Sequence, residues 1–251
     1  MKATEINIDR LSVGPLQDSS TVSSQKIAWI EYDGDKKKHL QIQTPAFITE
    51  TYGVPRQGPY YPTDKTRAFY KLPFCHERAE FKDQLDYELL EQFYNKMLEL
   101  DKFFGSEERK LQLFGEKMAG KYEYQPLVRQ PEVNDEEEED EERSKTYYRP
   151  PYMKVKLPLS YDDDVPTFHL INKKPNGEKE ELALTDFGDV VKHMKFLTKH
   201  RMILEIHKLY AMKTSSGKDK RKYGLTVKLL LAECTNKNEE RVNQCVIAFD
   251  D

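Results

Sequence analysis

The sequence has few cysteines, and none of them lies in a pair spaced like a metal or redox motif. Cys75, Cys234 and Cys245 are the 3 cysteines. An odd and widely spaced set argues against a disulfide framework and favours a reducing compartment. The chain also lacks a signal-peptide core near its start and any run of about 20 apolar residues. We therefore expect a soluble, intracellular protein without membrane contact.

The sequence also lacks the short motifs that carry common chemistry. It contains no GxxxxGK[ST], GxGxxG or GxSxG segment. His193, His200 and His207 recur every seven residues, but a predicted change from helix to strand between them removes a common metal-binding face. The acidic triplet 162–164 is typical of a solvated turn. Because nothing combines a nucleophile, a base and an orienting group, we predict no enzyme, no metal site and no cofactor.

Charge is abundant, and the formal total of −4 conceals two segments of opposite sign. Residues 192–228 contain 11 Lys and Arg residues, against only Glu205 and Asp219. Residues 132–142 contain 9 acids and no base, and removing them would change the formal charge from −4 to +5. The sequence therefore predicts a basic body with an acidic tether, and a basic surface favours a polyanionic partner such as nucleic acid.

Hydrophobic periodicity predicts a mostly β chain with inserted helices. The predicted strands are 26–32, 39–43, 66–72, 153–159, 167–171, 179–184, 201–212, 223–234 and 245–249. The predicted helices are 80–104, 106–118 and 186–197. Asp33-Gly34 and Pro175-Asn176-Gly177 each predict a hairpin between the strands that flank them. The alternation of strands favours an OB-fold-like antiparallel β-barrel with extra strands.

The composition divides the chain into an arm and one domain. Residues 1–24 are polar and rich in Ser and Thr, which predicts a flexible N-terminal arm. Residues 25–250 are expected to form a single OB-like domain. The acidic, self-repelling segment at about 130–145 would interrupt that domain as a disordered insertion. It could be a solvated spacer, or it could compete with nucleic acid for the basic surface.

Cations and aromatic side chains occur together in the segments 60–71, 147–156 and 208–223. A protein that binds single strands needs cations along the phosphates and aromatic faces on which bases stack. The period of a strand places Tyr152, Lys154 and Lys156 on one face. The alternative for each segment is a solvated face, a solubilising loop or core packing, and Trp29 is predicted to be core. The candidate nucleic-acid-binding residues are Tyr147, Tyr148, Arg149, Tyr152, Lys154, Lys156, Lys208, Tyr210, Lys213, Lys220, Arg221, Lys222 and Tyr223.

Several phrases of the chain resemble a known family. They are KFFGSEERKLQLFGEK at 102–117, KYEYQPLV at 121–128, YMKVKL at 152–157 and KYGL at 222–225. Residues 65–235 are similar to the OB-fold single-stranded-DNA-binding proteins of nucleocytoplasmic large DNA viruses, themselves similar to a podovirus-phage replication protein. The resemblance implies an OB barrel, cooperative coating of exposed strands and contacts with replication proteins. The phage proteins carry their acidic run at the C-terminus, whereas here it is internal.

The sequence as a whole predicts sequence-nonspecific binding of single-stranded DNA in viral DNA replication, recombination and repair. The lysines and arginines of the candidate set would contact phosphates, and the tyrosines would stack on bases. Polymerase or helicase are the expected protein partners, with a homodimer or cooperative self-assembly on DNA. The expected location is the host's cytoplasmic virus factory or its nucleus. Two alternatives stay open, a virion structural or scaffold protein with an acidic docking segment, and an RNA-binding protein.

Overall fold

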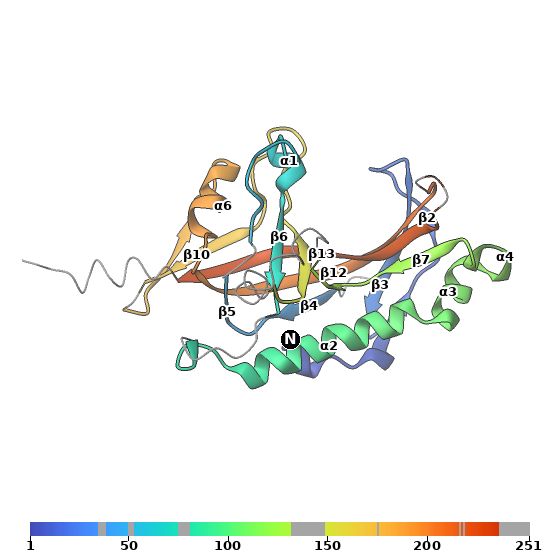
Figure 1. Ribbon diagram of the computed structural model, residues 1–251, viewed down its shortest axis with the longest axis horizontal. Coiled ribbons are helices and arrows are strands. Elements are labelled where there is room, and N and C mark those ends of the chain that lie inside the picture. The colour runs from blue at the N-terminus through green and yellow to red at the C-terminus, as the bar shows by residue number, and fades with distance from the viewer. Residues whose placement is uncertain are drawn as a thin grey trace, which may run out of the picture.

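The structure, a computed structural model, describes residues 1–34, 39–49, 53–74, 81–131, 149–174, 176–215, 217 and 219–235. Across these residues the protein is mostly β with a few helices, as predicted. The predicted strand at 245–249 and the acidic segment lie outside the described residues. Figure 1 shows an elongated molecule built around two long strands, with helices on both sides of them.

The two long strands form the central hairpin. They are β12 (Lys199–Met212) and β13 (Arg221–Thr235), paired antiparallel from Lys199↔Thr235 to Ala211↔Tyr223. Their apolar, β-branched and aromatic content made them the strongest predicted strands. The register shifts twice, between Ile203 and Leu204 and between Ile206 and Lys208. Shifts of this kind bend a strand and re-aim a side chain, and the second one leaves His207 without a partner in the ladder.

Three short strands follow one another along the free edge of β12. They are β3 (Gln25–Tyr32), β4 (Leu40–Gln43) and β5 (Phe47–Ile48), all antiparallel to β12. β3 and β4 therefore run in the same direction, so the hairpin predicted between them at Asp33-Gly34 is wrong. A turn is present there, with φ of 64° and 69°. The end of β3 pairs with β1 (Leu11–Val13) instead, and its start pairs with β2 (Gln17–Asp18).

The free edge of β13 is covered in the same way, but by parallel neighbours. These are β7 (Tyr122–Gln125), β9 (Tyr152–Lys156) and β10 (His169–Lys173). β10 pairs antiparallel with β11 (Lys179–Leu182), which confirms the second predicted hairpin. β9 also pairs with β6 (Phe69–Pro73) and β8 (Val128–Arg129).

The sheet is therefore mixed, which corrects the prediction of a purely antiparallel one. Its main path runs β1-β3-β12-β13-β10-β11, and within the described ranges the last strand does not pair with the first. Parallel neighbours cannot be joined by a tight turn, and β7, β9 and β10 are each separated from β13 along the chain by other strands and helices. Closure into an OB-fold barrel stays a prediction.

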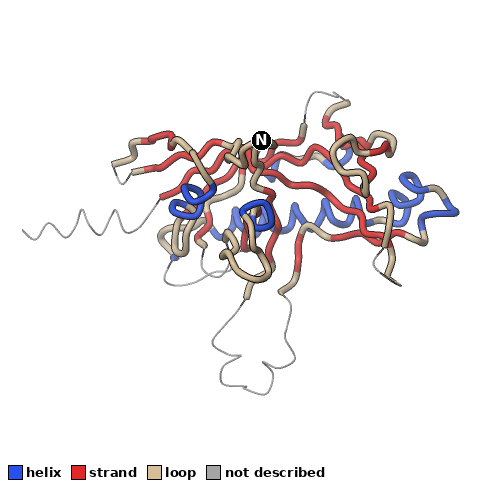
Figure 2. Tube along the Cα trace, turned by 90° about the horizontal axis from the view of Figure 1, so that it is seen from above, coloured by secondary structure: helices blue, strands red, loops and turns tan. Residues whose placement is uncertain are grey.

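A long helix covers one face of the central hairpin (Figures 1 and 2). α2 (Tyr87–Gly105) begins later than predicted, because the Asp86 side chain accepts a hydrogen bond from the Leu89 amide at 3.0 Å and caps it there. Its buried stripe consists of Leu90, Phe93, Met97, Leu100 and Phe104. Gly115, with φ of 69°, divides the next predicted helix into α3 (Glu107–Phe114) and α4 (Glu116–Ala119).

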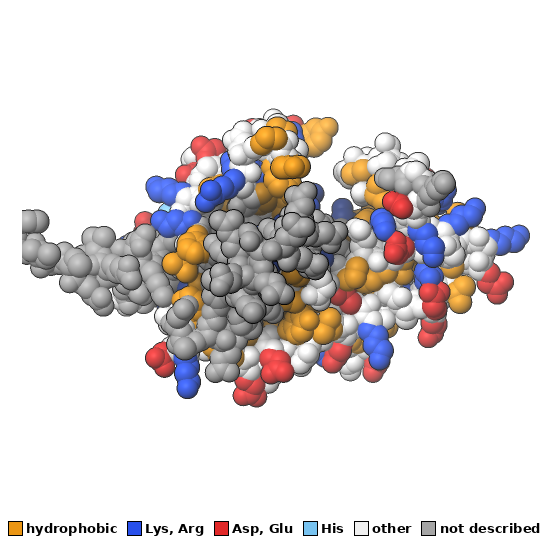
Figure 3. Space-filling model, viewed as in Figure 1, with side chains coloured by type: hydrophobic (Ala, Val, Ile, Leu, Met, Phe, Trp, Pro, Cys, Tyr) orange, Lys and Arg blue, Asp and Glu red, His pale blue; other side chains and the backbone are white. Residues whose placement is uncertain are grey.

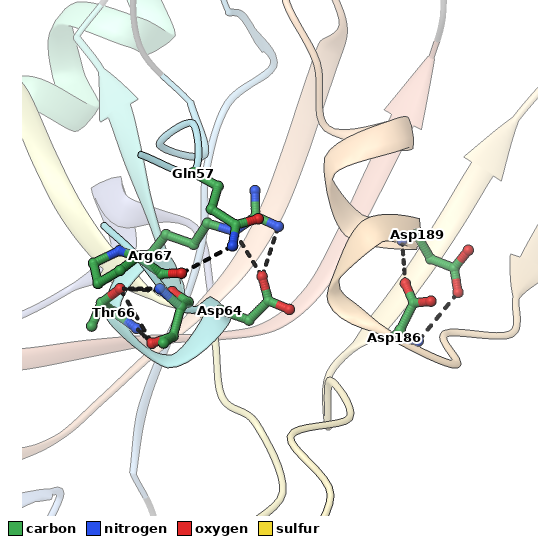
Figure 4. Close-up of polar contacts among 8 residues, drawn as sticks. Gln57, Asp64, Thr66, Arg67, Asp186 and Asp189 are labelled. Carbon is green, nitrogen blue, oxygen red and sulfur yellow. Dashed lines mark hydrogen bonds and ion pairs between the residues drawn. The ribbon is translucent and has the colours of Figure 1, made fainter. Parts of the chain in front are cut away.

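Two short helices lie on the opposite side of the hairpin from α2 (Figure 1). α1 (Asp64–Arg67) stands where a strand start was predicted, and Arg67 donates to Asp64 at 2.7 Å within it. α6 (Phe187–His193) begins after Asp186, whose carboxylate accepts from the Asp189 amide at 3.1 Å. Figure 4 shows that the two clusters of polar contacts are separate. They cap and brace helices, and they form no common site.

The N-terminal segment differs from the predicted flexible arm. Two 3-10 turns, Ala3–Glu5 and Ile8–Arg10, lead into β1. Ala3, Ile6 and Leu11 are buried in the main core. The segment is held because its few apolar residues reach the core that α2 and the sheet share, although its overall composition is polar.

Two histidines lie on the central hairpin, His200 inside the core and His207 half-buried beside Trp29. His200 is buried, with Nδ1 3.3 Å from the Cys234 sulfur and its ring centroid 5.6 Å from those of Phe47 and Tyr70. Burial lowers the pKa of His200 to about 3. Burial, assisted by Lys228, lowers the pKa of His207 to about 4. Both rings are therefore neutral at pH 7.

We expect the protein to lose stability on acidification below pH 6.5. The unfolded chain takes up protons on these histidines near pH 6.5, while the folded chain does not until about pH 4 or 3. Each histidine then lowers the free energy of unfolding by up to about 1.4 kcal/mol per pH unit. Urea unfolding between pH 7.5 and 4.5 measures this slope. His200→Leu should reduce it, whereas the control His169→Gln, at a solvent-exposed position, should not. Equal slopes in all three proteins would contradict the prediction.

Candidate nucleic-acid interface

β9 presents its polar side chains outward, as predicted. Met153 and Val155 are buried, while Lys154 and Lys156 are exposed and Tyr152 is half-buried. Pairing with β6 on one edge and β8 on the other fixes this orientation. The ammonium of Lys154 lies 3.8 Å from the ring centroid of Phe69, and that of Lys71 lies 5.0 Å from the ring centroid of Tyr152. The outer face of β9 therefore carries cations braced by aromatic rings.

The end of β9 brings this row of cations to the central hairpin. Lys156 is aligned with Lys228 on β13. Lys208 on β12 lies directly opposite Thr226 on β13 and opposite Trp29 on β3. Directly opposite residues on neighbouring strands project from the same side of a sheet. We call the resulting surface the basic face; it comprises Trp29, Lys71, Arg129, Tyr152, Lys154, Lys156, Lys208, Tyr210 and Lys228.

The cations of the basic face are close enough to repel one another. Burial lowers the pKa of Lys208, and the neighbouring Lys156 and Lys228 lower it further. Burial likewise lowers the pKa of Lys154, with smaller contributions from Arg129 and Lys71. Like charges held together in a partly desolvated site repel one another, and the binding of an anion would offset this repulsion.

Few carboxylates balance this charge. Among the described residues, none forms an ion pair with Arg129, Lys154, Lys156 or Lys208. Lys228 differs, because Glu205 holds its ammonium at 2.7 Å. Four cations are thus available to phosphates without breaking an ion pair to the described part of the chain.

Trp29 corrects the prediction that it belongs to the core. Its side chain is 41% exposed, although Ala28 and Ile30 on either side are buried. The ring centroid lies 5.8 Å from that of His207, the residue at the register shift of β12. The period of the strand could have found this: Ala28, Ile30 and Tyr32 share the buried parity, and Trp29 has the other. A large aromatic ring beside Lys208 is what stacking on an unpaired base requires.

Tyr210 lies on the basic face two residues beyond Lys208. It is half-buried, and its hydroxyl donates to Gln125 Oε1 at 3.0 Å. The residue opposite it is Gly224, where a Cβ would come within 3.2 Å of the Tyr210 hydroxyl and 2.9 Å of the Gln125 carbonyl oxygen. The ring is therefore fixed, and only part of its surface is open to a ligand.

Tyr223 does not lie in the candidate interface, which corrects its predicted stacking role. It is fully buried, and its hydroxyl donates to the Phe104 carbonyl oxygen at 3.2 Å. The rings of Phe114 and Tyr124 pack against it with centroids 5.1 and 5.3 Å away. It faces α2, on the other side of the sheet from Lys208. Its place within a basic segment gave no indication of this.

Two lysines at the tip of the hairpin, Lys213 and Lys222, form ion pairs with acids from other strands. Lys213 pairs with Asp18 at 2.8 Å, and Lys222 pairs with Glu123. The guanidinium of Arg221 lies 5.8 Å from the ring centroid of Tyr122, and Lys220 is exposed. The basic sequence of the tip thus has a structural role as well, which argues against counting all four as phosphate contacts. Of the remaining predictions, Arg149 is half-buried before β9, and Tyr147 and Tyr148 lie outside the described residues.

Asp101 on α2 connects the helix to the strands that carry Arg129. Its carboxylate accepts hydrogen bonds from the Tyr124 hydroxyl at 2.9 Å and from the amides of Leu127 and Val128 at 2.7 and 2.9 Å. These bonds fix the turn between β7 and β8, and β8 in turn pairs with β9. Arg129, Lys71 and Lys228 were missing from the predicted set because their positions depend on this packing.

The outline of the molecule fits such an interface. Figure 3 shows that the side away from α2 is divided by a notch between two lobes, with Lys and Arg side chains on both lobes. In the described ranges there is no group of three His, Cys, Asp or Glu side chains that could hold a metal ion. Among the helices the structure describes, none is long and apolar enough to cross a membrane.

Comparison with known proteins identifies a similar viral protein but gives no information about function. The chain is 26% identical to an uncharacterized protein, R505, of Acanthamoeba polyphaga mimivirus, over an alignment of 268 positions. The alignment includes 97% of this chain and 63% of that protein, so the chain spans less than two thirds of its relative's length. No family model matches the sequence. The similarity suggests a viral origin and assigns no activity.

Proposed function

We propose that this protein binds single-stranded DNA without sequence specificity, through the basic face. The observation that carries the proposal is the meeting of four cations with the exposed ring of Trp29. None of the four forms an ion pair with a carboxylate of the described residues; they are Lys154, Lys156, Lys208 and Arg129. Cations take the place of phosphate counterions, and an aromatic ring accepts any base. Neither contact reads a base sequence.

The arrangement favours an unpaired strand over a duplex. Trp29 can stack only on a base whose face is open, and in a duplex that face is covered by its neighbours. The basic face also spans β3, β12, β13 and β9, so a strand crossing it would meet several cations in succession. The proposed role is in replication, recombination or repair of a viral genome, in the virus factory or nucleus of the host. Cooperative self-assembly and contacts with polymerase or helicase belong to the same proposal.

Equilibrium binding over a salt series tests this function. The ligands are a labelled 30-nucleotide single strand, the matched duplex and the same sequence as RNA. We expect the DNA strand to bind much more tightly than the duplex, with log K falling by about 3 to 4 per decade of salt for roughly five phosphate contacts. Tighter binding of the RNA would favour the RNA-binding alternative. Strong self-association without any nucleic-acid binding would favour the virion scaffold.

Deleting residues 132–142 is expected to tighten single-strand binding at low salt. The deletion removes 9 negative charges, and a tethered polyanion competes with phosphates for the same cations. We expect a gain of about tenfold at 50 mM salt that disappears near 500 mM, where charges are screened. A variant with the acids replaced by Ser and Gly at equal length controls for the tether itself. Unchanged affinity at low salt in both variants would contradict the competition.

A further inference from the structure

A second cationic site lies near the tip of the hairpin, on the side of the sheet that faces α2 and α3. It is a cavity of about 580 Å³ between α3 and the ends of β1, β3, β7 and β13. In Figure 1 it lies at the end of the molecule that carries β2, β7 and α4. Lys213 and Arg221 share the parity of the buried Ala211 and Tyr223. The cavity is therefore separated from the basic face by the thickness of the sheet.

The wall of the cavity has two chemically distinct parts. Four cations line it, Lys26, Arg109, Lys213 and Arg221, and none of the described lining residues is acidic. Asp18 offsets part of this charge, because it pairs with Lys213 at 2.8 Å. The rest of the wall is largely apolar and includes Leu16 and Phe114.

The two arginines are held in fixed positions. The guanidinium of Arg109 lies 4.2 Å from the ring centroid of Phe103, and one of its nitrogens donates to Gln112 Oε1 at 2.7 Å. Arg221 lies over Tyr122, whose ring stacks on that of Phe114 with centroids 3.7 Å apart. A guanidinium braced in this way loses little entropy when it binds phosphate with two parallel hydrogen bonds.

We propose that this cavity binds a small phosphate ester, with the phosphates on the cations and a flat or apolar group against the wall. Its volume lies in the usual range for sites of organic ligands. A free nucleotide and the 5′-phosphorylated end of a nucleic-acid strand share this chemistry. A bare inorganic anion would leave the apolar wall unused.

Isothermal titration of the full chain with ATP tests the site without single-stranded DNA. We expect saturable binding with a Kd below about 1 mM at moderate salt. Adenosine, which lacks phosphate, should not bind, and tripolyphosphate, which lacks the ring, should bind more weakly. Tripolyphosphate binding as tightly as ATP would overturn the role of the apolar wall. The 5′-phosphorylated thymidine dinucleotide, compared with its 5′-hydroxyl form, distinguishes a strand end from a free nucleotide.

Gln112→Glu is the sharpest variant. Gln112 is exposed on α3 and already accepts a bond from Arg109, so a carboxylate of the same size would neutralise Arg109 in place and leave the packing intact. We expect ATP binding to weaken about tenfold, as for the loss of one charged hydrogen bond. Arg109→Gln with Arg221→Gln should weaken it further, with the melting temperature as a check on folding.

Two controls separate this site from the basic face. Lys195→Gln removes an exposed cation between α6 and β12, at the far end of the hairpin, and should leave ATP binding unchanged. Lys208→Gln should also leave it unchanged. Absence of saturable ATP binding would overturn the proposal, as would a Gln112→Glu protein that binds like the parent. A loss of ATP binding in Lys208→Gln would place the ligand on the basic face instead.

Discussion

Replacing Lys154, Lys156 and Lys208 together with glutamine is expected to weaken single-stranded-DNA binding about 100-fold at low salt. These three ammonium groups lie on β9 and β12, the strands on either side of β13 in the basic face, and none forms an ion pair with a described carboxylate. Each contact releases counterions, so the salt slope should also fall by about 2. The fold should be retained, because burial and, to a smaller extent, neighbouring cations disfavour the charged forms and lower the pKa of Lys154 and Lys208, and neutral glutamines remove both costs.

A matched variant removes the same number of charges elsewhere. Lys179, Lys213 and Lys222 each pair with an acid, Glu233, Asp18 and Glu123 respectively. Their triple replacement by glutamine changes the net charge equally and should weaken binding only a few-fold. Fluorescence anisotropy with a labelled 30-nucleotide strand at several salt concentrations compares the two proteins. If both triples lose affinity to the same extent, binding depends on total charge and the basic face has no special role.

Trp29→Ala is expected to weaken single-strand binding by 1 to 3 kcal/mol, or roughly 5- to 150-fold, if one base stacks on the ring. The loss should be nearly independent of salt, since no charge is removed. Trp29→Phe should recover part of it. The stability cost should be modest, because 41% of the side chain is already exposed. Tryptophan fluorescence adds a direct readout: Trp29 is the only tryptophan in the chain, and a stacked base should quench it.

Tyr161→Ala is the control for the loss of an exposed aromatic side chain. Tyr161 is 93% exposed and stands beside the acidic turn 162–164, where a phosphate would be repelled. Its replacement should leave the affinity unchanged. A Trp29→Ala protein that binds as tightly as the parent, or whose loss vanishes at high salt, would exclude stacking at this position.

Local patterns in the sequence determined the longer elements of the fold and one strand of the candidate interface, but they predicted neither helix α1 nor the short strands β1, β2, β5, β7 and β8. The long strands, the turn at Asn176-Gly177 and the outward positions of Lys154 and Lys156 follow from a period of two and from turn chemistry, which act over a few residues. Charge alone separated the acidic segment from the basic body. The helix boundaries were less certain, because caps such as Asp86 compete with several neighbouring polar residues.

Tertiary structure decided which of these elements meet, and therefore which cations form a surface. β3 and β4 align along β12 instead of pairing with each other, and this places Trp29 opposite Lys208. Tyr223 is buried against α2, where its hydroxyl donates to the Phe104 carbonyl oxygen. At the tip of the hairpin, Lys222 pairs with Glu123 and Lys213 pairs with Asp18, and both acids are distant in the chain. Such contacts join residues far apart in the chain, and their free energy depends on shape and burial that no local pattern contains.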